Sequence, residues 1–312
     1  MKKTLHSKQV LSLVLVLIAF LLFGTYLTIE ADTEKNENRF GFLGSKVLSD
    51  FLFAYGVQGY LLPLPYNKSH YDGLAGYLHH HGGRHILDRI DRPENLMKFM
   101  EDGASGPHGN PLHLERLNPS YALTRVLSLD VVKSLDDALC TIMLAEPLYE
   151  AVLSNQITPL SESHFTLVHE SAHCHVLTRK HDWATWSERY PGFNLRSMTQ
   201  ASNEAERIAI EYQHEALADV TALVYFLHNY ELTEIEFDQI VSNYVSIRQK
   251  TEGKAKATYR GHETSRAISA LQGQRAALIA NRDEYEADPI QAMLDFFFRD
   301  IKSSALNSPT AE

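Results

Sequence analysis

The residues best suited to chemistry lie in the stretch L-V-H-E-S-A-H-C-H-V, from Leu167 to Val176. His169 and His173 are four positions apart, so on an α-helix both imidazoles project from one face and can bind the same ion. Glu170 follows His169 directly. In an H-E-x-x-H arrangement this glutamate acts on zinc-bound water and does not bind the metal itself. Because the chain holds 16 histidines, a chance match is possible, and the motif needs support from other residues.

A second stretch, E-Y-Q-H-E-A-L-A-D-V-T-A-L, supplies carboxylates at the same spacing. Glu215 and Asp219 are four positions apart on an expected helix whose face is otherwise small and apolar. Because a carboxylate on a buried face needs a partner, Glu215 is expected to be the third zinc ligand. Asp219 lies one turn later and could accept the outer N–H of a ligand histidine, which would fix the tautomer of that ring.

Alternatives to this third ligand stay open. Glu204, Glu211 and Glu215 follow one another at helical spacing, so they could form an exposed acidic stripe without a metal. His214 and Glu211 are rival ligands, because a rotation of the helix would present either of them.

The sequence H-E-S-A-H followed by E-A-L-A-D resembles the gluzincin metallopeptidases. In that family H-E-x-x-H supplies two zinc ligands and a downstream E-x-x-x-D helix supplies the third. The resemblance implies that His169, His173 and Glu215 hold one zinc ion. It also implies that Glu170 is the general base and that Asp219 orients His169.

A third stretch, Y-R-G-H-E-T-S-R-A-I at 259–268, resembles the later helix of thermolysin-like enzymes. This likeness implies that His262 steadies the developing oxyanion, with Tyr259 as a helper. The metzincin pattern is excluded, because it requires Gly and His where this chain has Val176 and Arg179.

Helices are needed to position these residues, and apolar side chains recur at helical spacing after residue 134. We expect helices over 135–154, 164–180, 203–230, 234–250, 257–282 and 290–305. Asp288-Pro289 is expected to open the last helix as cap and first-turn proline. The segment 122–132 is the best of few strand candidates. The predicted fold is mainly α, of the α+β zincin-like type, with a helical metalloprotease core and at most a small sheet.

An apolar run without charge follows Lys2, Lys3 and Lys8 at the N-terminus. About 20 such residues at ~1.5 Å rise span a hydrocarbon layer, so 9–29 is expected to be an uncleaved transmembrane anchor. Positive charge before it and acidic residues after it predict a cytoplasmic N-terminus and an extracytoplasmic body. The other expected divisions are a basic tip (1–8), an acidic stalk (30–40), an N-terminal part of the body that acts as lid, prodomain or subdomain (41–133), a catalytic domain (134–302) and a disordered tail (303–312).

Composition limits the other possibilities. The net charge of −10 and a pI near 5.9 disfavour nucleic acid as a partner. Cys140 and Cys174 are too few for a disulfide scaffold, and Cys174 is interpreted as a small apolar residue on the back of a helix. His79, His80 and His81 point in different directions on any regular structure, so a second metal site there is disfavoured.

Together these expectations predict a membrane-anchored zinc metallopeptidase that hydrolyses peptide or protein substrates with zinc-activated water and a glutamate base. One zinc ion is the expected cofactor. The alternative is a non-catalytic, membrane-tethered zinc-binding or assembly protein. Its structural site would fill the fourth position of the metal with His214 or His262.

Overall fold

The computed structural model describes residues 58–64, 122–128, 138–154, 156–179, 182–193, 195, 201–252, 263–300 and 306. Across these ranges the chain is mainly helical and includes one small sheet, so the predicted mainly α fold is confirmed at this level. Outside them lie several predicted features: the basic tip, the acidic stalk and the histidines at 79–81. Leu306, the described residue of the expected tail, is buried.

The sheet joins three segments that are far apart in the sequence. Strands β1 (Gln58–Leu64), β2 (Ala122–Ser128) and β3 (Ala138–Ala145) have the order β1-β3-β2. β1 pairs with β3 in parallel, which sets Leu61 opposite Ile142, and β2 pairs with β3 antiparallel. The sheet therefore joins segments on both sides of the predicted boundary between the N-terminal part and the catalytic domain.

The prediction of one helix over 135–154 is wrong in its first half, because residues 138–145 form strand β3 instead. The run A-L-C-T-I-M-L-A is almost wholly apolar, and every side chain from 140 to 145 is buried. A continuous apolar run of this length suits a strand covered on both faces, and periodicity alone does not distinguish it from a buried helix. The helical part is α6 (Glu146–Leu153). The strand expected at 122–132 is confirmed as β2.

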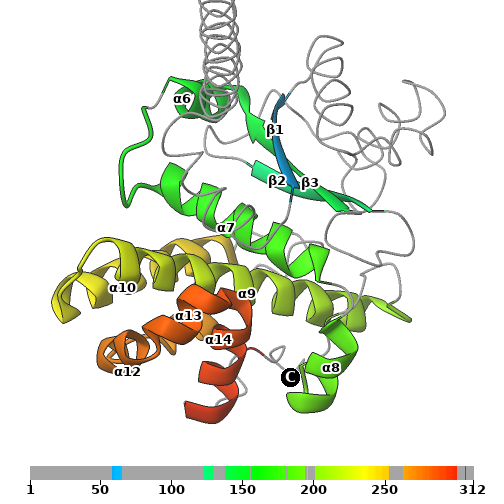
Figure 1. The fold of residues 1–312 in the computed structure, drawn as a ribbon, viewed down its shortest axis with the longest axis vertical. Helices are drawn as coiled ribbons and strands as arrows, with labels where there is room; N and C mark the ends of the chain where they lie inside the picture. The colour runs from blue at the N-terminus through cyan, green and yellow to red at the C-terminus, as the bar shows by residue number, and fades with distance from the viewer. Residues whose placement is uncertain are drawn as a thin grey trace, which may run out of the picture.

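Helix α7 (Glu162–Thr178) carries the H-E-x-x-H stretch and lies between the sheet and helix α9 (Glu204–Asn229), as Figure 1 shows. Each helix begins at a polar cap: the side chains of Ser161 and Asn203 accept hydrogen bonds from first-turn backbone N–H groups. The two helices that hold the predicted ligands therefore pack directly against each other, and α7 also packs against the sheet.

Shorter helices surround α9, and every side chain of α9 from Ala216 to His228 is buried. The helix expected over 257–282 is represented in the described residues by two short helices, with Gly273 between them at φ 69°, a conformation that favours glycine. The helix expected over 290–305 is capped by Asp288 as predicted, forms α14 (Pro289–Asp295) and continues as the π-helix η8 (Phe296–Asp300) up to the last described residue of this segment. The remaining elements are α8 (Trp183–Arg189), α10 (Glu234–Glu252), α11 (Ser265–Ser269), α12 (Arg275–Ala280) and α13 (Arg282–Ala287).

The localisation predicted from the sequence, a single-pass membrane protein with an extracytoplasmic body, is corrected. Within the described ranges no helix is both long and apolar enough to cross a bilayer. The longest described helix, α9, has 26 residues but carries charged side chains, including Glu204, Arg207 and Asp219, which a hydrocarbon layer disfavours. The predicted anchor at 9–29 lies outside the described residues.

Cys140 of β3 and Cys174 of α7 form a disulfide. The interpretation of Cys174 as a small apolar residue on the back of a helix did not foresee this bond. Both cysteines are fully buried, and 34 positions separate them. Two lone cysteines at this separation give no local signal of pairing, because only the packing of α7 against the sheet brings them together.

Candidate metal centre

His169 and His173 of α7 converge with Glu215 of α9. Nε2 of His169 lies 3.0 Å from Nε2 of His173 and 3.4 Å from Oε2 of Glu215. Nε2 of His173 lies 3.3 Å from Oε1 of the same carboxylate. Both histidines are buried and Glu215 is partly buried, so the site is mostly shielded from solvent. These three residues, called the metal group below, can hold a metal ion.

The spacing of the donor atoms fits a small tetrahedral ion. Bonds of about 2.0–2.1 Å, the lengths found for zinc, set neighbouring corners of a tetrahedron about 3.3–3.4 Å apart. The three separations in the metal group are 3.0, 3.3 and 3.4 Å. One ion could therefore contact all three residues with little movement of their side chains.

Asp219 fixes the orientation of His169. Nδ1 of His169 lies 2.8 Å from Oδ1 of Asp219, whose side chain is fully buried. A carboxylate this close to Nδ1 favours a proton on that nitrogen, and a metal ion would then bind at Nε2, which faces the metal group. The contact expected between Asp219 and a ligand histidine is present.

The electrostatic surroundings of His169 favour a cation. Burial lowers the pKa of His169, but Asp219 and Glu215 outweigh this effect and raise the pKa to about 10. Burial acts to raise the pKa of Asp219, but Arg248 and His169 hold it below its usual range. The carboxylates that attract a proton to the ring attract a metal ion to the same place.

The charges around the metal group also fit a divalent ion. Burial lowers the pKa of the Arg248 guanidinium, but Asp219, Glu215 and Glu170 raise it overall, so all three carboxylates act on this cation. Three carboxylates and one guanidinium leave two negative charges when the ring of His169 is neutral, the state in which it can bind a metal. Buried charges need compensation, and a divalent cation would supply it.

Glu170 lies on α7 directly after His169, and its side chain is buried. It is not a member of the metal group, which comprises the two histidines and Glu215. Glu170 adjoins a member of the metal group along α7 without belonging to the group, and its role as proton acceptor stays a prediction.

The rival third ligands make other contacts. Nη1 of Arg207 donates a hydrogen bond to Glu211 at 3.0 Å. The ring of His214 lies 5.4 Å from the ring of Trp183, in an edge-on arrangement. Neither Glu211 nor His214 belongs to the metal group. Glu211 is moreover buried, so the residues of α9 do not form the exposed acidic stripe considered as an alternative.

Sequence reasoning did not single out two further residues, Arg248 of α10 and Thr264 just before α11. Both bond to Asp219, although 29 and 45 positions separate them from it. No helical spacing connects such distant positions, so only the resemblance of 259–268 to a site helix pointed towards Thr264. Tyr259 and His262, the residues predicted from that resemblance, lie outside the described residues.

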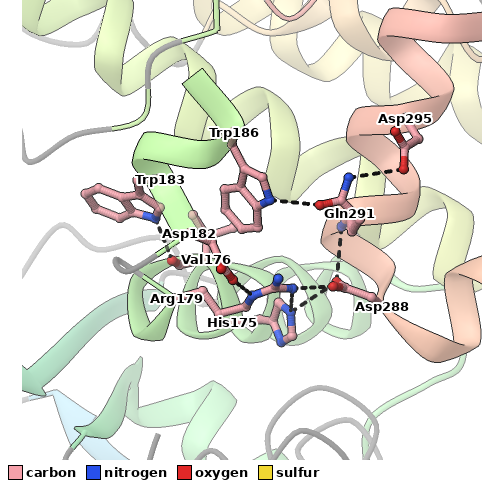
Figure 2. Close-up of polar contacts among 9 residues, drawn as sticks. All are labelled: His175, Val176, Arg179, Asp182, Trp183, Trp186, Asp288, Gln291 and Asp295. Carbon is pink, nitrogen blue, oxygen red and sulfur yellow. Dashed lines mark hydrogen bonds and ion pairs between the residues drawn. The ribbon is translucent and has the colours of Figure 1, made fainter. Parts of the chain in front are cut away.

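A separate polar network holds the C-terminal end of α7, as Figure 2 shows. Arg179 pairs with Asp288, the cap of α14, and its guanidinium lies 4.8 Å from the ring of Trp186 in α8. Nε2 of His175 lies 3.5 Å from Oδ1 of Asp288, so this histidine belongs to the network and not to the metal group. These contacts tie the motif helix to α8 and α14.

Comparisons of the chain with protein-family models, curated proteins and solved structures found no match. The likeness to gluzincins therefore rests on the motif residues alone.

Proposed function

We propose that this chain is a zinc-dependent hydrolase that cleaves peptide bonds, with a site of gluzincin type. The observation that carries the proposal is the convergence of His169, His173 and Glu215, whose donor atoms lie 3.0 to 3.4 Å apart. Glu170 directly follows the first of these residues, where a general base is needed.

Zinc is the metal that best suits this donor set. Two imidazoles and one carboxylate form several known catalytic zinc sites, whereas calcium and magnesium prefer oxygen ligands. Catalytic zinc sites use three protein ligands and keep one position for water or substrate, whereas structural sites use four. Among the described residues the metal group has three members. His214, one of the two candidates for the fourth ligand of a structural site, is not among them, and His262, the other candidate, lies outside the described residues.

A bound zinc ion would polarise a scissile carbonyl group and lower the pKa of water at the site towards ~7. Glu170 then accepts the proton that water loses as it attacks the carbonyl carbon, and it returns this proton to the leaving amine. Asp219 keeps the ring of His169 oriented throughout. The resemblance to thermolysin-like enzymes assigns oxyanion stabilisation to His262, helped by Tyr259.

The test is Glu170→Gln in the full chain. Glutamine keeps the shape and polarity of the side chain but cannot accept the proton, so zinc content should stay unchanged. Cleavage of an unstructured protein, followed by mass spectrometry, should fall by at least ~10²-fold. Glu162→Gln is the matched control, because Glu162 is exposed in the first turn of the same helix and should leave cleavage unchanged.

Two outcomes would contradict the proposal. If Glu170→Gln cleaves as fast as the wild type, Glu170 is not the base. If the zinc-loaded wild type cleaves nothing in a mixed peptide library, the chain is better described as a non-catalytic zinc-binding protein.

A further inference from the structure

The carboxylate of Asp219 contacts side chains from three elements other than its own helix, α9. His169 of α7 lies 2.8 Å from Oδ1. From α10, Nη2 of Arg248 lies 2.5 Å from Oδ1, and Nε lies 2.9 Å from Oδ2. The hydroxyl of Thr264, at the entry to α11, donates a hydrogen bond to Oδ2. One fully buried carboxylate therefore joins the metal group to α10 and α11.

These donors use the full capacity of the carboxylate. An ionised carboxylate offers about four lone-pair sites, two on each oxygen. Oδ1 pairs with the His169 ring and accepts a hydrogen bond from one arm of Arg248, and Oδ2 accepts hydrogen bonds from the other arm and from the hydroxyl of Thr264. With its acceptor sites occupied, the carboxylate has one favoured orientation, which is the orientation that holds His169 towards the metal group.

We propose that Arg248 and Thr264 are positioning residues of the metal centre, which act through Asp219 on His169 and so make metal affinity depend on the docking of α10 and α11. The inference rests on the proposed function in one respect, that His169 is a metal ligand. On this account Arg248 and Thr264 act through Asp219 and bind neither the metal nor the reacting atoms.

The two residues contribute different things. Arg248 supplies charge and a planar fork that binds both oxygens, and lysine cannot reproduce that fork. Thr264 is fully buried and supplies one directed hydroxyl. Without it, one lone pair of Oδ2 would be buried with no donor, which favours rotation of the carboxylate away from His169.

The test measures zinc affinity of the full chain by competition with a chelator. Arg248→Met and Thr264→Val should each weaken zinc binding by about 10-fold or more, within the range found when a residue supporting a metal ligand is removed. Thr264→Ser keeps the hydroxyl and should restore near-wild-type affinity. Arg248→Lys should recover only part of the loss. Matched controls are Arg282→Met and Thr158→Val, because both residues are exposed and away from Asp219.

A spectroscopic readout separates positioning from a general loss of structure. The proton shared between Nδ1 of His169 and Asp219 should give a downfield resonance in NMR spectra of the wild type and of Thr264→Ser. The same resonance should be weakened or displaced in Thr264→Val, although the helical circular dichroism is unchanged.

The outcomes distinguish this inference from the proposed function. If the wild type binds zinc and cleaves peptides, but Arg248→Met and Thr264→Val bind zinc as tightly as the wild type, the positioning role is wrong and the function stands. If Thr264→Ser fails to restore affinity while Thr264→Val retains the resonance, the effect is not carried by the hydroxyl, and the inference also fails. A wild type that binds no zinc would overturn the proposed function first.

Discussion

Cys174 directly follows His173 on α7, and its sulfur is bonded to that of Cys140 in β3. The sheet is therefore joined covalently to the helix that supplies two members of the metal group. The bond connects positions 34 apart, so it restricts a sizeable loop in the unfolded chain.

The double variant Cys140→Ala, Cys174→Ala should lower the free energy of unfolding by about 2–4 kcal/mol, the range expected for loss of a native disulfide. Urea denaturation of the full chain measures the change. A reductant should destabilise the wild type by a similar amount and leave the double variant unaffected. Equal stability of wild type and variant, with and without reductant, would show that the bond contributes nothing.

His228 has a different environment from the histidines of the metal group. It lies near the end of α9 and is buried, and within the described part of the chain neither ring nitrogen has a hydrogen-bond partner. Its ring packs 4.9 Å from that of Tyr285. Burial, with a further contribution from Arg282 that exceeds the opposing effect of Glu286, lowers the pKa of His228 to about 4.

This shift predicts a loss of stability in acid. The unfolded chain takes up a proton at His228 near pH 6.5, whereas the folded chain does so only near pH 4. Stability is therefore unaffected above pH 6.5 and falls as the pH drops from 6.5 towards 4, by up to about 3 kcal/mol from this residue. His228→Leu should remove this part of the pH dependence. If urea midpoints of the variant and wild type fall in parallel with pH, the assignment to His228 is wrong.

The helices that carry the metal group were predictable because their signal is local. In α7 and α9 the pairs His169–His173 and Glu215–Asp219 follow the four-residue spacing that sets side chains on one helical face. The structure brings both pairs together, with Glu215 in the metal group and Asp219 against His169. Local spacing thus carried most of the information about this site.

The features that sequence reasoning missed depend on tertiary packing. The buried run at 138–145 has no periodicity that separates strand from helix, and it becomes a strand because β1 and β2 pair with it. Arg248 and Thr264 reach Asp219 only when α10 and α11 dock. The disulfide likewise depends on the packing of α7 against the sheet.

The central claim is that His169, His173 and Glu215 together hold one zinc ion, and elemental analysis of purified full-length variants tests it most directly. The wild type should carry one zinc per chain. His169→Ala, His173→Ala and Glu215→Ala should each lose it, whereas Glu211→Ala should retain it, because Glu211 pairs with Arg207 outside the metal group. Full zinc content in Glu215→Ala, together with loss of zinc in Glu211→Ala or His214→Ala, would contradict the account.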